Sequence, residues 1–249
     1  MNPSTFLSKP FLAVAFFCIA SCGGQDNKES TEITTSTDST TNTTTATTNP
    51  APSTITTTPQ NMMVVRHKVA DFNKWKTSYD AGDSLRLANG VHSYVIGRSV
   101  KDSNIVLVAV RVDDINKAKA FAKDAALKQA MQKGGVVGAP QINFTIMTFQ
   151  DTGTINSGLR SRTTFKVKDW DSWQRSFDSS RQIRKDNGII DRAYGHDADD
   201  NHKVTVVVAV MDTAQAYAFW KSDELKKLQA ASGVASQPER FIYRVVQRY

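Results

Sequence analysis

The chain has 249 residues and a formal net charge of +7, from 31 Lys and Arg against 24 Asp and Glu. No stripe of aromatic and basic residues accompanies this charge, so no nucleic-acid partner is predicted. The sequence also has no P-loop, dinucleotide fingerprint or nucleophile elbow, and these absences count against the enzyme classes that depend on them.

Residues 1–21 have the proportions of a signal peptide, with an apolar run at 11–20 that is too short to span a bilayer. The run ends in Ile19-Ala20-Ser21-Cys22, which resembles the lipobox of bacterial lipoproteins. The resemblance implies lipidation of Cys22 and a membrane anchor in the bacterial cell envelope, and Gly23 favours the outer membrane. The alternative is an ordinary secretory signal. The other cysteine, Cys18, lies in the signal, so no disulfide is expected in the folded part.

Residues 22–60 are rich in Thr and Ser and have no apolar face to bury, which predicts a disordered tether. A flexible chain of this length has an end-to-end distance of roughly 35 Å. The remaining sequence divides into a first unit at 61–150, a polar linker at 151–162 and a second unit at 163–249.

The first unit alternates strand and helix patterns. Strands are expected at 63–69, 91–99, 105–112 and 142–149, and helices at 72–89 and 115–133. Asp71 and Asp114 are predicted N-caps, and Asp124 is a point where the second helix could restart. In the strand at 105–112 both faces are apolar, so we expect it to be covered on both sides.

The second unit repeats the first, because residues 63–140 and 161–238 align without gaps at a constant offset of 98. Such self-similarity indicates duplication of one folding unit. The corresponding elements are expected at 163–167, 169–187, 189–195, 204–210, 212–231 and 241–247.

A βαββαβ order predicts a ferredoxin-like antiparallel sheet with both helices on one face. The other face would be bare, and these strands are too apolar for that. The predicted fold class is therefore α+β, with two tandem ferredoxin-like units packed sheet to sheet as an intramolecular pseudo-dimeric α/β barrel. A monomer is expected.

Several segments resemble the dimeric α/β-barrel superfamily, which includes the antibiotic-biosynthesis monooxygenase-like proteins. They are the run from His67 to Trp75, Asn89-Gly90, Ala120-Phe121 and the run from Gly134 to Pro140. The resemblance implies a pocket between the sheet and helices of each unit. It also implies that a cofactor-free monooxygenase would use Trp, Tyr, Asn and Arg around the anionic form of an aromatic substrate. Neither second helix contains the histidine that some haem-degrading members use, which counts against haem breakdown. No cofactor is expected.

The candidate ligand-binding residues, chosen by type, are His67, Trp75, Arg86, His92, Tyr94, Tyr194 and His196.

His67 shares strand parity with Val65 and Val69 and should point inward, whereas the second unit has Phe165 at this position. It could serve as a base or hydrogen-bond donor in one pocket only, or it could be a buried histidine satisfied by a neighbour. Trp75 shares a helical face with Phe72 and Tyr79, which favours a core residue over a ligand contact. The His and Asp residues at 196–202 lack metal-ligand spacing and are expected to form a solvated turn without a metal.

Two functions remain open. The first is a lipid-anchored envelope protein whose barrel binds a small, largely apolar ligand or a partner. The alternative is a cofactor-independent monooxygenase, or a related isomerase or cyclase, that acts on an aromatic substrate.

Overall fold

The computed structural model describes residues 53–249. The expected signal peptide, the lipidation site Cys22 and most of the expected tether lie outside these residues. No helix in the described part is long and apolar enough to cross a membrane.

The described residues form a mixed α+β fold with a large antiparallel sheet and eight helices. A short strand, β1 (Ile55–Thr56), comes first. The first half then contains β2 (Gln60–Val69), α1 (Phe72–Ala81), α2 (Asp83–Ala88), β3 (Val91–Ser99), β4 (Ile105–Val112), α3 (Ile115–Phe121), α4 (Ala125–Lys133) and β5 (Val136–Asp151). The second half contains β6 (Leu159–Lys166), α5 (Trp170–Ser179), α6 (Arg181–Asp186), β7 (Ile189–Asp197), β8 (Lys203–Val210), α7 (Thr213–Lys221), α8 (Asp223–Ala231) and β9 (Glu239–Arg248).

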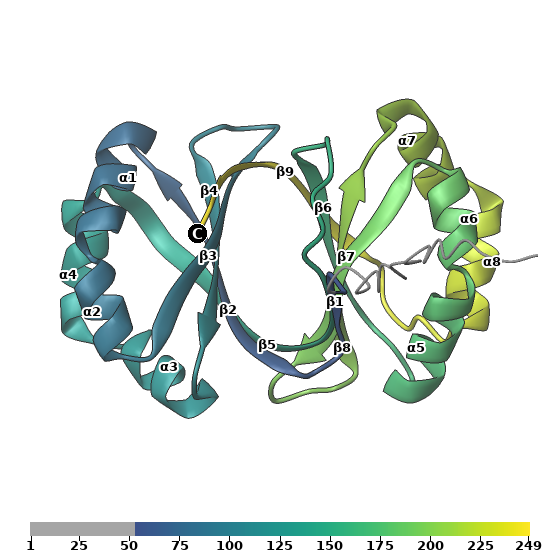
Figure 1. Cartoon of the computed structure of the whole chain (residues 1–249), viewed down its shortest axis with the longest axis horizontal. Helices are drawn as coiled ribbons and strands as arrows, with labels where there is room; N and C mark the ends of the chain where they lie inside the picture. The colour runs from purple at the N-terminus through teal and green to yellow at the C-terminus, as the bar shows by residue number, and fades with distance from the viewer. Residues whose placement is uncertain (1–52) are drawn as a thin grey trace, which may run out of the picture. The chain divides into compact units, whose positions relative to one another are not determined.

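The strands follow the same spatial order in both halves. The order is β5-β2-β4-β3 in the first half and β9-β6-β8-β7 in the second, so each half places its fourth strand beside its first. Two further pairings, β3 with β9 and β5 with β7, join the halves. Eight strands thereby form a closed ring, with α1–α4 outside one half and α5–α8 outside the other (Figure 1).

Three apolar clusters fill this arrangement. One lies between the first half of the sheet and its helices, and a second occupies the same place in the second half. The third lies inside the ring around Val64, Leu107 and Tyr243. Strand β4 contributes Val106 to the first cluster and Leu107 to the third, which confirms that it is covered on both faces.

Aspartate caps begin the helices where the sequence predicts them. The carboxylates of Asp71, Asp114 and Asp124 accept hydrogen bonds from backbone N–H groups in the first turns of α1, α3 and α4. The expectation of one helix over 72–89 is wrong, because α1 ends at Ala81, α2 begins at Asp83, and Gly82 separates them. Glycine is unfavourable inside a helix, which accounts for the break at this residue. The second half breaks at Ser180, whose hydroxyl donates back to the carbonyl oxygens of α5.

The ends of the predicted tether and linker also differ from the structure. Strand β1 pairs with Gln150 and Asp151 of β5, so the expectation of disorder up to residue 60 is wrong. Strand pairing uses backbone groups, and a Thr-rich segment can therefore join a sheet edge without an apolar face. Strand β6 begins at Leu159, inside the linker expected at 151–162, because its backbone pairs with β9.

Candidate functional site

A cavity of about 80 Å³ lies between the first half of the sheet and its helices. Strands β2, β3, β4 and β5 form its floor, and all four helices of this half contribute to its walls. The lining is mostly apolar, and its polar side chains are Ser78, Tyr79, Arg86, His67 and the indole of Trp75. The cavity therefore brings together three of the sequence-predicted candidates, His67, Trp75 and Arg86.

His67 enters this cavity from β2 as a buried side chain. Burial lowers the pKa of its imidazole from 6.5 to about 4, so the ring is neutral at pH 7. Among the described residues, neither Nδ1 nor Nε2 has a hydrogen-bond partner. A neutral imidazole has one donor and one acceptor nitrogen, and a buried polar group without a partner is costly. His67 is thus available to a ligand, and the idea that a neighbour satisfies it is wrong for the described residues.

The remaining polar groups are linked by a column of rings on α1. The ring centroids of His67 and Trp75 lie 5.3 Å apart, and those of Trp75 and Tyr79 lie 5.2 Å apart. The guanidinium of Arg86 lies 3.8 Å from the centre of the Tyr79 ring. Burial raises the pKa of the Tyr79 phenol, which shares a 2.9 Å hydrogen bond with the hydroxyl of Ser93. The rings of Trp75 and Tyr79 therefore lie between the imidazole of His67 at one end and the guanidinium of Arg86 at the other.

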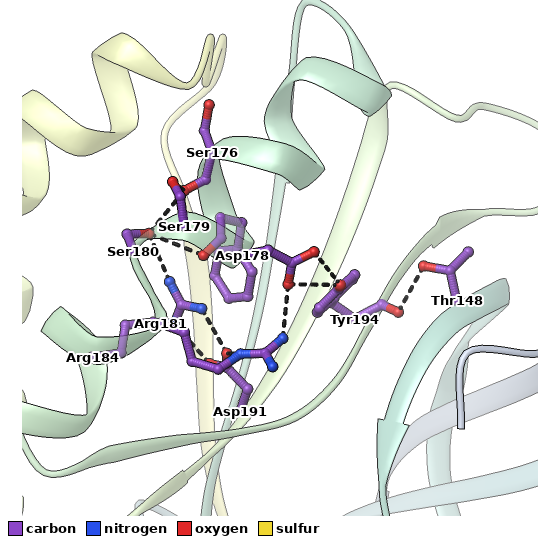
Figure 2. A network of polar contacts seen from close by, with 10 residues as sticks. Thr148, Ser176, Asp178, Ser179, Ser180, Arg181, Arg184, Asp191 and Tyr194 are labelled. Atoms are coloured by element: carbon purple, nitrogen blue, oxygen red, sulfur yellow. Dashed lines mark hydrogen bonds and ion pairs between the residues drawn. The ribbon is translucent and has the colours of Figure 1, made fainter. Parts of the chain in front are cut away.

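The second half has a corresponding cavity of about 100 Å³, but its arginine is neutralised internally. Arg184, at the position equivalent to Arg86, donates from Nε and Nη2 to the two oxygens of Asp191 at 2.7 and 2.6 Å. Its Nη1 donates to the hydroxyl of Ser180 at 2.9 Å (Figure 2). Both charged side chains are buried, at 9% and 3% exposure. Figure 2 shows that this pair belongs to a wider network with Arg181 and Tyr194.

Arg86 has neither of these two partners. At an offset of 98, Ser93 stands where the second half has Asp191, and Gly82 stands where it has Ser180. The carboxylate that pairs with Arg86 is that of Asp83, at 2.9 Å, and the Asp83 side chain is 51% exposed. Arg86 Nε is buried without a partner among the described residues. The first cavity therefore holds a cation whose compensating charge is largely in solvent, and an anionic oxygen could complete its shell.

The other four candidates lie away from this cavity. His92 is exposed and contacts Asp113. Tyr94 lines a different cavity, inside the ring of strands. Tyr194 is buried in the second half, where burial and a hydrogen bond to Asp178 raise its pKa to about 12. His196 packs edge-on against a tryptophan of α5 and bonds a backbone carbonyl. In the described residues, no group of three or more His, Cys, Asp or Glu could hold a metal ion.

Sequence reasoning did not single out Ser93 and Gly82, yet these two positions decide which partners the arginine has, and Ser93 alone decides the charge. The signal was present in the repeat, because aligning the halves sets Ser93 against Asp191 directly. What the sequence alone did not show is that Asp191 and Arg184 meet. That contact depends on the end of α6 lying over β7.

No protein-family model matches the chain, and no curated protein matches its sequence. Solved structures do resemble it. A "putative monooxygenase" from Fusobacterium nucleatum aligns with a TM-score of 0.51 and 12% identity, over 76% of this chain and 93% of that one. An anthrone oxidase-like protein aligns with a TM-score of 0.54 and 13% identity, over 76% and 92%. At these identities the likeness shows that the fold is similar to that of dimeric α/β-barrel proteins.

Proposed function

We propose that the cavity of the first half is the active site of a cofactor-independent monooxygenase that acts on a small aromatic substrate in its anionic form. The proposal includes the finer architecture: two tandem ferredoxin-like units in one chain, of which only the first retains the site. The names of the structural neighbours favour this chemistry over a purely binding role. The observation that carries the proposal is the contrast between Arg86 and Arg184.

Arg86 would bind the substrate oxygen. The positive charge of Arg184 is already compensated by a buried carboxylate. Arg86 donates from Nη1 to the carbonyl oxygen of Tyr79 at 2.6 Å and from Nη2 to the half-exposed Asp83. Arg86 retains a buried, unpartnered Nε and lies against the cavity. A phenolate or enolate oxygen placed there would gain a charge-assisted hydrogen bond and would be stabilised in its ionised state.

His67 would position the substrate hydroxyl. Its imidazole is neutral at pH 7, and both nitrogens lack partners among the described residues. With a pKa of about 4 the imidazole is a weak base, so its role is to hold the substrate hydroxyl in a hydrogen bond, while Arg86 stabilises the anion and the proton passes to solvent. The anion then supplies the electrons, and O₂ is the co-substrate. One oxygen atom replaces two hydrogens on a CH₂ carbon to give a carbonyl, and the other leaves as water, so no external reductant is needed.

The size of the cavity limits the substrate. At about 80 Å³ it is smaller than the roughly 150 Å³ of an apolar cavity that holds benzene. A ring can enter only if side chains in the wall move. Met131 and Leu127 of α4 line the cavity and are only partly buried, and methionine adapts its shape readily. We therefore expect a one-ring substrate to displace these two side chains.

The test is oxygen uptake by the purified protein with a panel of one-ring phenols that carry a CH₂ group conjugated with the hydroxyl, and with anthrone as a larger comparison. ¹⁸O₂ traces the inserted atom. Ser93→Asp introduces at Arg86 the carboxylate that the second half already has, and we expect at least a tenfold loss of kcat/KM. Ser93→Ala is the matched control, because it removes the same hydroxyl without adding charge. Equal activity of Ser93→Asp and wild type would refute the role of Arg86.

A non-catalytic binding module is the second candidate, and the pKa of about 4 at His67, which makes the imidazole a weak base, is the observation that favours it. In that case the same compounds would bind without oxygen uptake, and Ser93→Asp would still weaken their binding.

We also propose that lipid on Cys22 anchors the protein in the cell envelope. Palmitate labelling of wild type and Cys22→Ala in a bacterial host tests it.

A further inference from the structure

The space inside the closed ring of strands is separate from the proposed active site and carries its own charge. A cavity of about 370 Å³ lies there, lined by the apolar side chains of Val64, Leu107 and Phe241 on one side. Its charged lining consists of three cationic side chains, Arg66, Arg162 and Lys203, and one carboxylate, Glu239. A second cavity of about 70 Å³ adjoins it, since Val64, Leu107 and Arg162 line both.

Two of the three cations are already paired. Arg66 lies 3.2 Å from Glu239, and Lys203 lies 3.1 Å from Asp197. Arg162 differs, because no carboxylate of the described residues lies within ion-pair distance of it. Its Nη2 reaches Asn143 Oδ1 at 3.5 Å and Thr205 Oγ1 at 3.3 Å, both long for hydrogen bonds. Its Nε is buried and has no partner among the described residues.

The neighbouring side chains intensify this positive charge. Arg160 and Arg192 line the smaller cavity and are buried. Asp151 pairs with Arg192 at 3.1 Å, whereas Arg160 donates only to backbone carbonyl oxygens in the described residues. Burial lowers the pKa of Arg160 and of Arg162 to about 10. Buried charges are normally paired, so among the described residues Arg160 and Arg162 lack a counter-anion.

We propose that the interior of the ring binds a small organic molecule through an oxyanion group, with Arg162 as its anchor. The planar guanidinium suits the paired oxygens of a phosphate or carboxylate. Asn143, Gln141 and Thr164 line the same cavity and supply neutral donors around that group. The volume of about 370 Å³ exceeds the needs of inorganic phosphate and lies in the usual range of small-molecule sites. The apolar wall would contact the rest of the molecule.

The experiment measures the melting temperature with inorganic phosphate or glycerol 3-phosphate, at an ionic strength held constant with NaCl. At one hundred times its Kd, the bound anion should raise Tm by about 5–10 °C. Arg162→Gln removes the anchor and should abolish the shift. Asn143→Asp is nearly isosteric and supplies the missing carboxylate beside Arg162, so it should abolish the shift even if Arg162→Gln fails to fold.

Two controls separate this site from its surroundings. Arg175→Gln removes one positive charge from the exposed surface of α5 and should keep the full shift. Ser93→Asp gives Arg86 a carboxylate partner in the other cavity. This variant should also keep the full shift in melting temperature, because the two cavities are distinct. A larger shift with glycerol 3-phosphate than with phosphate supports an organic ligand. The proposal is overturned by no shift with either probe, or by equal shifts in wild type, Arg162→Gln and Asn143→Asp.

Discussion

Replacing His67 by Phe tests whether the buried imidazole is neutral in the folded protein. Burial lowers its pKa from 6.5 to about 4, so between these pH values the unfolded chain binds a proton that the folded chain does not. Stability therefore rises with pH across this window. The contribution of His67 is fully present above pH 6.5 and is lost as the pH falls through about 4. At 1.36 kcal/mol for each pKa unit, the free energy of unfolding changes by about 3 kcal/mol between these two pH values.

The second half indicates that Phe can be accommodated at the position of His67. It already carries Phe165 at the equivalent position, packed against the tryptophan that corresponds to Trp75. We therefore expect His67→Phe to fold, and to be at least as stable as wild type at pH 7. Its advantage over wild type should grow by about 3 kcal/mol between pH 7 and pH 4, because Phe does not titrate.

Urea unfolding at several pH values between 4 and 7.5 gives the comparison directly. Carboxylates also titrate in this range, so the decisive quantity is the difference between variant and wild type at each pH. His92→Phe is the control, since His92 is exposed and lies outside the cavity. Parallel stability curves for wild type and His67→Phe would refute the argument that burial keeps the imidazole neutral.

Three further predictions concern stability, each measured by urea unfolding at pH 7. Asp191→Asn breaks a buried, doubly hydrogen-bonded ion pair and should cost about 3–5 kcal/mol, while Asp223→Asn, in an exposed pair, should change little. A small effect of Asp191→Asn would contradict the packing in Figure 2. Trp75→Ala should cost about 3–5 kcal/mol through the cavity it leaves, and a cost below 1 would mean that the ring is not core. Gly195→Ala places a Cβ 2.0 Å from the backbone oxygen of Ile146, so it should disrupt the β5–β7 pairing; an unchanged stability would argue against that closure.

Much of the fold was readable from periodicity and from the repeat. The valines of β4 alternate with Leu107 and Ala109, and this pattern predicted a strand covered on both faces. The cap residues predicted where helices begin. The breaks at Gly82 and Ser180 and the addition of β1 to the sheet were missed, because each depends on backbone pairing or local geometry that leaves no hydrophobic signature.

The site was only partly readable. Strand parity placed His67 inward, and helical spacing placed Trp75 on the buried face. Residue type alone then added His92, which lies on the surface, and Tyr194, which belongs to the other half. The charge state of the site could not be read, because it depends on which side chain of β3 or β7 faces the arginine of the preceding helix.

The presence of both halves in one chain has a genetic consequence. In a symmetric homodimer a substitution appears in both pockets at once, so a carboxylate at the Ser93 position would pair with the arginine of both. Here separate codons specify Ser93 and Asp191, and each half can change without the other. One half can hold its arginine in a buried ion pair with Asp191, while the other leaves the Nε of Arg86 without a partner among the described residues.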